Sequence, residues 1–417
     1  MTLHLQKSTI QKRSSVEITG SKSEANRLLI LQALYPEISI NNVSNSDDSQ
    51  LMQKALASKE NVVDIHHAGT AMRFLTAYFS AKKDREVVLT GSQRMKERPI
   101  KILVDALKDL GADISYVENE GFPPLKIKGK ILTKSKVTLK ADVSSQYISA
   151  LLLIGSSLEN GLQLTLDGKI TSVPYIKMTL SLLNEIGIEN TFVENTITVK
   201  QKQTEVKPQI LTVESDWSSA SYFYSIVALS DLGIEVKLSS YKENSLQGDS
   251  VLAEIYKQFG VSTTFQNNSI LLQKTSIVNN KTKVNLDLSN APDIAQTISV
   301  TAFGLGLQCH LTGLHTLKIK ETDRLVALQN ELRKFGAEIE ITNDSLTLEA
   351  HNIYQSSNNS FLEKFTESIS TYNDHRMAMA FAPLALKQSF IIENADVVSK
   401  SYPDFWSDLN QIGFIFK

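Results

Sequence analysis

The chain has 417 residues and a formal net charge of −2, with 42% hydrophobic and 21% charged residues. This composition is ordinary for a globular protein with a full core, and the length favours two or three domains, or two large ones. Because the charge is near neutral, no bulk field points to nucleic acid or an anionic membrane, and the single cysteine, Cys309, excludes an internal disulfide and a cysteine-based metal site.

No early apolar segment is typical of a signal peptide, and no run in the sequence approaches the ~20 apolar residues that span a membrane. We therefore expect a cytoplasmic protein. With so little net charge, any binding of anions has to come from local groups of residues.

Taken in chain order, the segments that predict helices begin with polar residues. Helix N-termini leave backbone N–H groups unpaired and carry a partial positive charge, so each start is a ready anion site. The expected caps and first residues are Ser21 or Ser23, Gly69 and Thr70, Ser144 or Ser145, Ser172 ahead of Pro174, Pro292 and Asp293, Thr322, and Asp374.

Several of these predicted helix starts also carry cations, a choice that opposes the helix dipole. Because this unfavourable placement is repeated, we infer that a bound anion makes the electrostatic energy of the cations at these helix starts favourable. In the stretch "NDHR", 373–376, we therefore expect Arg376 to face a ligand, with Asp374 capping the helix and bracing the arginine fork. The cations at helix starts are Lys22, Arg27, Arg73, Lys320, Arg324 and Arg376.

Each of these residues also has an ordinary interpretation. The serines can be plain caps, and Arg27 and Arg324 can be solvated residues paired with Glu24 and Glu321. His375 can be a satisfied core histidine. The combination is much more specific than any member.

The chain also repeats one pattern of an amphipathic helix, a glycine, an alternating strand, a polar turn and a second strand. The glycine suits the position after a helix, where a left-handed backbone costs no Cβ clash. A fixed period indicates one repeated unit of about 75 residues, with room for five to six copies. The glycines are Gly111, Gly187, Gly260 and Gly336, spaced by 76, 73 and 76 residues, with a partial copy at Gly413.

The motifs, taken together, resemble the 5-enolpyruvylshikimate-3-phosphate synthase family from about residue 10 to about residue 410. The resemblance implies an α/β fold of two domains, each of three βαβαββ units about a pseudo-threefold axis, an inside-out α/β barrel. It also implies a continuous domain 20–214 and a discontinuous domain 1–19 plus 215–417. The matching motifs include "GSKSEANR", "AGTAMR", "LTGSQRMKERPI", "SSQ", "PYI", "SDWSSASYF", "NSLQGD", "KETDRL", "YNDHRMAM" and "KSYPDF".

This family transfers the enolpyruvyl group of phosphoenolpyruvate to the 5-hydroxyl of shikimate 3-phosphate and releases phosphate. By likeness, the residues expected to bind shikimate 3-phosphate are Lys22, Ser23, Arg27, Ser144, Ser145, Gln146, Ser172, Tyr175, Asp293 and Lys320. Those expected to bind phosphoenolpyruvate are Lys22, Gly69, Arg94, Gln146, Arg324, Arg376 and Lys400.

The resemblance also implies catalytic roles. Asp293 is the expected base toward the hydroxyl, Glu321 and Lys22 are expected to move protons on the enolpyruvyl side, and His375 is expected near the reacting carbons. Arg94 and Lys400 would stabilise the leaving phosphate. We expect no metal and no organic cofactor, small-molecule substrates, no nucleic-acid or membrane partner, and a monomer.

Two positions depart from the family pattern beside the expected phosphoenolpyruvate pocket. His67 stands where the family usually has asparagine, and Phe74 where it has proline. These departures affect the shape of that pocket and leave the reaction class unchanged.

Two alternatives have different sequence requirements. UDP-N-acetylglucosamine enolpyruvyl transferase shares the fold and the donor, but its usual loop cysteine has no counterpart, since Cys309 lies in an apolar stretch. A non-catalytic repeat scaffold that binds phosphorylated partners would need the cations but not the opposed acids Asp293 and Glu321.

Overall fold

The computed structural model describes residues 1–417 apart from 142–143, 169, 171–172, 203–205, 280 and 351–367. The chain divides into two compact units, one of residues Gly20–Glu214 and the other of Met1–Thr19 with Ser215–Lys417. Each unit is described on its own below, under the names continuous unit (20–214) and discontinuous unit (1–19 with 215–417). The described helices include none that is both long and apolar enough to cross a membrane.

The chain enters and leaves the continuous unit at neighbouring residues. The Ser21 N–H donates to the Glu214 carbonyl at 2.7 Å, and the Glu214 N–H donates to Glu24 Oε2 at 3.3 Å. On the other side of the boundary, the Asp216 N–H donates to the Thr19 carbonyl at 3.3 Å within the discontinuous unit. Each unit therefore closes its own chain ends.

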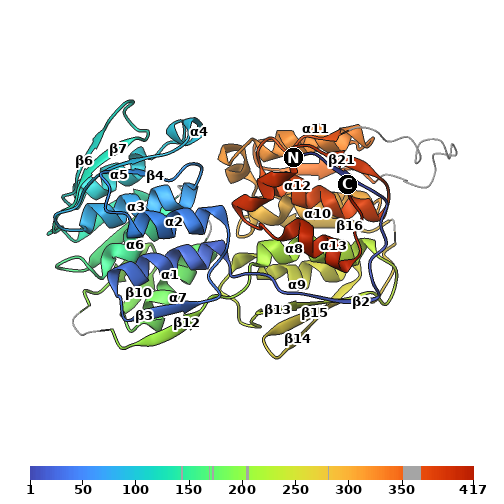
Figure 1. Cartoon of the computed structure of the whole chain (residues 1–417), viewed down its shortest axis with the longest axis horizontal. Coiled ribbons are helices and arrows are strands. Elements are labelled where there is room, and N and C mark those ends of the chain that lie inside the picture. Colours follow the sequence, from blue (N-terminus) through green and yellow to red (C-terminus); the bar gives the residue numbers. More distant parts are fainter. Residues whose placement is uncertain (142–143, 169, 171–172, 203–205, 280, 351–367) are drawn as a thin grey trace. The chain divides into compact units, whose positions relative to one another are not determined.

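The strands of the continuous unit form small mixed sheets (Figure 1). In the larger sheets, a parallel pair comes first and antiparallel strands complete the order. The first has the order β4 (Val62–Asp64), β5 (Glu86–Thr90), β7 (Leu125–Lys128), β6 (Asp113–Tyr116), and the second has β8 (Lys136–Lys140), β9 (Leu162–Asp167), β11 (Thr196–Val199), β10 (Asn190–Val193). The strands β3 (Ile38–Asn41) and β12 (Gln209–Thr212) form a parallel pair.

The helices of this unit pack together behind the sheets. The inner helices α1, α3 and α6 contact one another and bury most of their residues. In α1 the buried residues include the polar Glu24, Asn26 and Arg27. The helices are α1 (Lys22–Leu34), α2 (Asp47–Ala57), α3 (Gly69–Ala81), α4 (Gln93–Lys96), α5 (Lys101–Asp109), α6 (Ser145–Gly155) and α7 (Val173–Glu185).

The discontinuous unit repeats the same strand order. Two sheets again combine a parallel pair with antiparallel partners: β2 (Arg13–Val16), β13 (Glu235–Ser239), β15 (Ser269–Lys274), β14 (Val261–Gln266), and β16 (Lys283–Asp287), β17 (Gln308–Thr312), β19 (Leu346–Leu348), β18 (Ile339–Ile341). A third sheet joins β20 (Ser368–Ile369), β21 (Phe390–Ile392) and β1 (Leu3–Leu5), so the chain's first strand lies beside a strand near its end.

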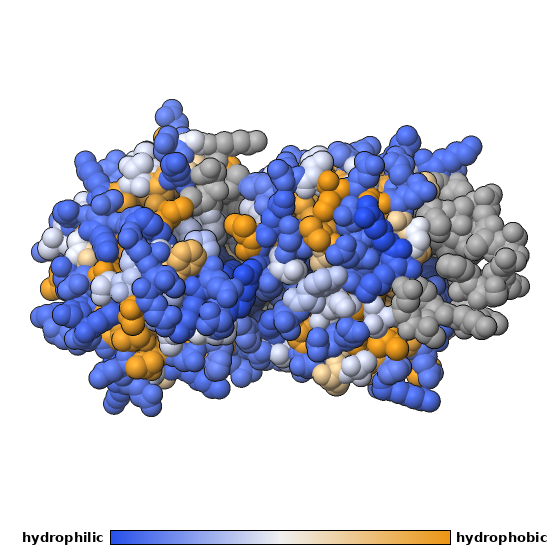
Figure 2. All heavy atoms as spheres, turned by 90° about the horizontal axis from the view of Figure 1, so that it is seen from above, coloured by the Kyte–Doolittle hydropathy of each residue, from blue (hydrophilic) through white to orange (hydrophobic). Residues whose placement is uncertain are grey.

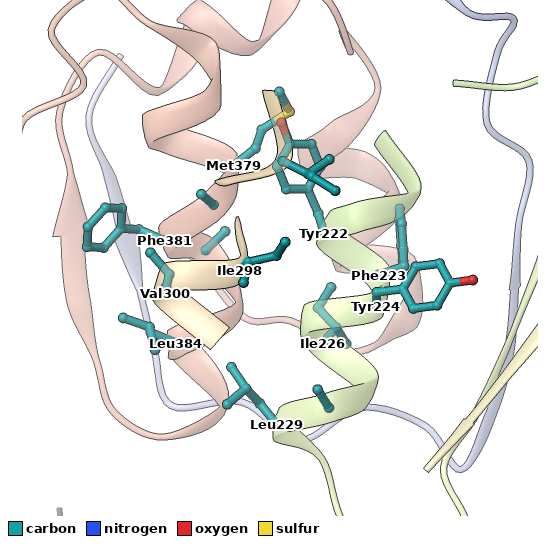
Figure 3. Packing of buried hydrophobic residues seen from close by; sticks show 14 of the residues in the cluster. Tyr222, Phe223, Tyr224, Ile226, Leu229, Ile298, Val300, Met379, Phe381 and Leu384 are labelled. Carbon is teal, nitrogen blue, oxygen red and sulfur yellow. The ribbon is translucent and has the colours of Figure 1, made fainter. Parts of the chain in front are cut away.

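Buried helices form the core of the discontinuous unit. Every residue of α10 and α12 is buried, and α8 buries nearly all of its residues. Figure 3 shows Tyr222 of α8 beside Met379 of α12, and Ile226 of α8 on the side that faces Ile298 of α10. The helices are α8 (Trp217–Leu229), α9 (Leu252–Ile255), α10 (Ala295–Gly304), α11 (Arg324–Lys334), α12 (His375–Phe381) and α13 (Phe405–Ile412), with 3-10 helices η1 (Gly248–Val251), η2 (Tyr256–Phe259), η3 (Pro292–Ile294), η4 (His315–Ile319), η5 (Ala382–Leu386) and η6 (Ala395–Lys400).

The surface matches the composition. Figure 2 shows hydrophilic side chains over most of the visible face of each unit, with hydrophobic residues in small separate patches. The polar residues outnumber exposed large hydrophobics because the apolar side chains are taken up by the inner helices.

The helix-ending glycines behave as their spacing predicts. Gly111, Gly187, Gly260 and Gly336 all have φ between 76° and 104°, in the left-handed region that favours glycine. The partial copy ends likewise at Gly413, with φ 119°. The repeated unit inferred from these glycines is therefore present in the backbone.

The predicted helix starts agree in part with the structure. Ser144 caps α6 through its hydroxyl, and α3 begins at Gly69 as expected. Ser21 is the N-cap of α1, although its side chain makes no capping bond to the described residues. The expected cap Thr322 is wrong, because Asp323 caps α11 and accepts from the N–H groups of Leu325 and Val326, each at 3.2 Å. Ser172 lies outside the described residues.

Candidate active site

Arg324 is the centre of a charged cluster in the discontinuous unit. Its guanidinium donates from Nε to Asp374 Oδ2 at 2.6 Å, from Nη1 to Asp293 Oδ1 at 2.8 Å and from Nη2 to Glu321 Oε2 at 2.8 Å. The side chain is only 2% exposed, and burial opposes its charge, but the carboxylates outweigh burial and raise the pKa of Arg324. The cluster therefore holds Arg324 charged in a place shielded from water.

Asp293 joins Arg324 to the other cations of this cluster. Its Oδ1 lies 3.4 Å from Lys320 Nζ, and its Oδ2 lies 3.5 Å from Arg376 Nη2. Burial raises its pKa, but Lys320, Arg376 and Arg324 together have the larger effect and hold the pKa of Asp293 well below its usual value. Asp293 is thus ionised in the ligand-free protein. Asp293 lies in the 3-10 turn η3, which leads into the buried helix α10.

Arg376 lies in the first turn of α12, next to the capping residue Asp374. The Arg376 N–H donates to Asp374 Oδ1 at 2.9 Å, and its Nη2 donates to Ser218 Oγ at 3.2 Å. The hydroxyl of Ser218 in turn donates to Asp249 Oδ2. The expected brace of the Arg376 fork by Asp374 is wrong, because the Asp374 carboxylate bonds the guanidinium of Arg324 instead.

The remaining expected residues of this unit lie around the same helix start. His375 is 2% exposed, and its Nδ1 lies 3.8 Å from Asp374 Oδ1. Lys400, the last residue of η6, donates to the Asn373 carbonyl at 2.5 Å, just before α12. Lys320 and Glu321 follow η4 and keep 29% and 28% of their side chains exposed, so this side of the cluster faces solvent.

In the continuous unit, Arg27 is the buried cation. It is 2% exposed and donates to the hydroxyls of Thr179 and Ser149, each at 2.8 Å, and to the Ser23 carbonyl at 2.7 Å. Burial lowers the pKa of Arg27 to about 10, with smaller opposing effects from Tyr175 and Glu24. No carboxylate among the described residues forms a salt bridge with it, so its charge lacks a direct counter-ion.

Aromatic rings cover the same guanidinium. The rings of Phe74 and Tyr175 have their centroids 5.4 Å and 5.9 Å from Arg27 Cζ, a distance at which a cation is attracted to a ring. Phe74 is one of the two departures from the family pattern. Its position on Arg27 means that this departure adds a cation–π contact instead of opening space.

The first turns of α3 and α6 meet in this unit. Gln146 Nε2 donates to Thr70 Oγ1 at 3.3 Å, beside Gly69. A Cβ at Gly69 would approach Arg98 Nη1 to 2.5 Å, so the guanidinium of Arg98 packs directly against this glycine. Ser144 and Ser145 begin α6, with Ser144 exposed and Ser145 half-buried. The expected residues Gly69, Ser144, Ser145 and Gln146 thus share one end of two neighbouring helices.

Lys22 and Ser23 begin α1, and both are half-buried. Burial raises the pKa of the nearby Asp48, while the charge of Lys22 acts in the opposite direction, followed by contributions that include His67 and Arg98. The other departure, His67, has its Nε2 3.8 Å from Asp47 Oδ2. Arg94 is 60% exposed on the short helix α4 and pairs with Glu97 at 3.2 Å, so in this structure it stands in solvent.

Some residues of these clusters were not singled out from the sequence. They are Ser218 and Asp249 beside Arg376, Ser149 and Thr179 beside Arg27, and Asp48 near Lys22. A signal did exist for Ser218 and Asp249. Both lie in the polar motifs "SDWSSASYF" and "NSLQGD", which carry the family resemblance.

Comparisons with known proteins identify the relatives of this chain. The family model described as EPSP synthase (3-phosphoshikimate 1-carboxyvinyltransferase) matches residues 52–409. A 3-phosphoshikimate 1-carboxyvinyltransferase of Bacteroides fragilis (strain YCH46) is 46% identical over 411 residues, which cover 98% of this chain and 97% of the relative. One of Histophilus somni (strain 2336) is 34% identical over 429 residues, which cover 95% and 96%.

Solved structures give the same picture of the fold. An EPSP synthase from Acinetobacter baumannii matches with a TM-score of 0.79 and 20% sequence identity, covering 100% of this chain and 99% of that chain. A second structure of EPSP synthase from the same organism has a TM-score of 0.78. These matches confirm the predicted fold class, a two-domain inside-out α/β architecture.

Proposed function

Because this chain belongs to the EPSP synthase (3-phosphoshikimate 1-carboxyvinyltransferase) family, and is therefore a transferase, we propose that it transfers the enolpyruvyl group of phosphoenolpyruvate to the 5-hydroxyl of shikimate 3-phosphate. The products are 5-enolpyruvylshikimate 3-phosphate and phosphate. The family match, the relatives that bear this activity in their names and the charged clusters described above all support this reaction.

The observation that carries the proposal is the contact of Asp293 with Lys320, Arg324 and Arg376. A site that only holds anions needs the cations, but it gains nothing from a carboxylate that neutralises them. A transferase needs both, because it binds anionic substrates and must also move protons. The cluster therefore favours catalysis over passive binding.

The two substrates bring the charges that these clusters match. Each carries a phosphate with about −1.5 to −2 charge at pH 7, and phosphoenolpyruvate adds a carboxylate. Arginine provides a bidentate fork for such groups, and lysine a compact charge. We propose that phosphoenolpyruvate binds Arg324, Arg376 and Lys400, with Lys22, Gly69, Arg94 and Gln146. For shikimate 3-phosphate we propose Lys22, Ser23, Arg27, Ser144, Ser145, Gln146, Ser172, Tyr175, Asp293 and Lys320.

Substrate binding changes the chemistry of Asp293. In the ligand-free protein its depressed pKa makes it a poor base, because the neighbouring cations stabilise the carboxylate. Anionic substrate groups that engage Lys320, Arg324 and Arg376 take up part of that positive charge. The pKa of Asp293 then rises toward its ordinary range, and the carboxylate becomes able to accept the proton of the attacking hydroxyl.

The remaining catalytic groups are assigned by chemistry. We propose that Glu321 and Lys22 deliver and recover the proton on the methylene carbon of the enolpyruvyl group. Arg94 and Lys400 would stabilise the departing phosphate. His375 is almost fully buried, with Nδ1 3.8 Å from Asp374 Oδ1, and we propose that it stands near the reacting carbons.

An assay of phosphate release tests the proposal. Purified protein should release phosphate only when shikimate 3-phosphate and phosphoenolpyruvate are both present. Release with UDP-N-acetylglucosamine as the acceptor would assign the related transferase activity instead. Tight binding of both compounds with no release by freshly purified, folded protein would support a phosphate-binding scaffold.

A further inference from the structure

The residues that lead into α12 form a turn with an unusual backbone. Tyr372 and Asn373 have φ values of 54° and 55°, both in the left-handed region, and the Asp374 N–H donates to the Thr371 carbonyl at 2.8 Å. A turn with two successive left-handed residues favours glycine, asparagine or aspartate at those positions. A bulky side chain such as that of Tyr372 is an outlier there, so something has to hold it.

Glu331 of α11 holds this turn. Its side chain is fully buried, and Oε1 accepts from the Tyr372 hydroxyl at 2.7 Å. Its Oε2 accepts from the Ser370 N–H at 3.2 Å and pairs with Lys334 Nζ at 2.6 Å. Burial and then Glu331 raise the pKa of Tyr372 to about 12, which keeps the phenol protonated as a donor. Glu331 therefore grips the chain on both sides of Thr371.

The same turn sets the positions of the cations proposed to bind phosphoenolpyruvate. Lys400 bonds the Asn373 carbonyl, and Arg324 bonds the Asp374 carboxylate. Arg376 follows two residues after Asp374, and its N–H donates to Asp374 Oδ1. A shift of the turn would move each of these partners.

One helix supplies both anchors of the turn. Arg324 and Glu331 are seven residues apart on α11, so their side chains leave the same face of the helix. Arg324 bonds Asp374, just after the two left-handed residues. Glu331 bonds Ser370 before the turn and Tyr372 within it. The turn is thus clamped at two points by one rigid element, which suits a site that must hold charges in place.

We propose that Glu331 and Tyr372 are positioning residues for phosphoenolpyruvate, acting through the 372–373 turn on Arg324, Arg376 and Lys400. This inference rests on the proposed function, since it assigns those three cations to the donor substrate. Neither Glu331 nor Tyr372 needs to touch a substrate. The hydrogen bond between Tyr372 and Glu331 offsets the strain of the left-handed backbone at Tyr372 and keeps the three cations at fixed positions relative to one another.

The test uses Tyr372→Phe and Glu331→Gln in the full chain. Loss or weakening of the clamp should raise KM for phosphoenolpyruvate about tenfold while KM for shikimate 3-phosphate changes little. The double variant should raise KM by less than the product of the two single effects, because the Tyr372 hydroxyl and the Glu331 carboxylate share one hydrogen bond. A purely structural role would lower the folded fraction and thus the apparent kcat, with both KM values unchanged, and this result would overturn the proposal.

Glu393→Gln is the matched control. Glu393 accepts from the hydroxyls of Ser368 on β20 and Ser370 just after it. The Glu393→Gln variant should therefore leave KM for phosphoenolpyruvate unchanged. An equal rise in this control would also contradict the specific role of the clamp.

A second measurement separates this inference from the proposed function. Amide exchange of Asp374 in the ligand-free protein reports the turn directly, because its N–H bonds Thr371, and exchange should accelerate about tenfold in Tyr372→Phe. If the wild type lacks the transferase activity, accelerated exchange still supports the clamp while the proposed function fails. Unchanged exchange in Tyr372→Phe and Glu331→Gln would overturn the clamp whatever the activity.

Discussion

Arg324 and Asp374 form an ion pair that is almost completely withdrawn from solvent. Arg324 Nε and Asp374 Oδ2 are 2.6 Å apart, and the side chains are 2% and 0% exposed. The pair joins the first residue of α11 to the N-cap of α12. Removing Arg324 would leave the buried carboxylate of Asp374 without this partner, whereas removing the charge of Asp374 leaves Arg324 paired with Asp293 and Glu321.

Asp374→Asn should destabilise the protein by about 1.5–3 kcal/mol, because it removes a charged hydrogen bond to the buried Arg324, which keeps Asp293 and Glu321 as partners, while an amide oxygen can still cap α12. Urea unfolding checks this. Asp323→Asn is the control, since Asp323 caps α11 through the same geometry and lies outside the ion pair, and it should cost about 1 kcal/mol or less. Equal losses in the two variants would show that capping, and not the ion pair, is what Asp374 contributes.

Arg376→Lys should weaken phosphoenolpyruvate binding by about 1.5–3 kcal/mol, because lysine keeps the charge but loses the bidentate fork. Affinity for shikimate 3-phosphate alone should change little. Titration calorimetry with each ligand measures both. Arg333→Lys on α11, where the side chain donates to the Ile339 carbonyl, should leave both affinities intact. Equal weakening for the two ligands would argue against a role of Arg376 specific to the donor.

Asp293→Asn should lower kcat by about 10²- to 10⁴-fold, the usual contribution of a positioned acid or base. The pKa of Asp293 in the ligand-free protein lies well below its usual value. Its protonation should therefore not limit kcat/KM until the pH falls below the ordinary aspartate range, near pH 4. If kcat/KM of the wild type falls on the acid side at a pH well above 4, and Asp293→Asn lacks this fall, the assignment is contradicted.

Asp249→Asn should change the pH dependence of stability. Burial raises the pKa of Asp249 from 3.8 to about 6, against the charge of Arg376 and with Asp293 and Asp216 nearby. The folded protein therefore retains a proton that the unfolded chain releases, so stability falls as pH rises from about 4 to about 6. The variant should remove this loss, gaining on the order of 2 kcal/mol at pH 7.5 and little at pH 4. Unfolding titrations at both pH values measure the gain in stability, and an equal gain at pH 4 and pH 7.5 would contradict the assignment.

Much of the architecture could be predicted from local pattern. The glycines Gly111, Gly187, Gly260 and Gly336 mark helix ends because only a residue without Cβ takes a left-handed backbone cheaply. The start of α3 at Gly69 and the cap at Ser144 follow from the same kind of local rule. The fold class and the family were predicted from motifs and are confirmed by the comparisons.

The partners of the site residues could not be predicted in the same way. Asp374 bonds Arg324, 50 residues away in sequence, instead of the adjacent Arg376 fork. Arg27 is satisfied by Ser149 and Thr179, 122 and 152 residues away. Such pairs form because folding brings separate helices together. A single sequence shows which residue types are present, but not which of them come into contact.

The closure of the continuous unit on itself has a consequence at the level of the gene. Because Ser21 and Glu214 are hydrogen-bonded neighbours, the segment 20–214 is an insert whose two ends need no added spacer to meet. Thr19 and Asp216 are likewise bonded across the opposite junction, so a host chain spliced from residue 19 to residue 215 would need little rebuilding. In the coding sequence, the codons for 20–214 therefore form one module inserted within the other. Excision of this module, or circular permutation at the junctions, should keep the hydrogen bonds that close each unit.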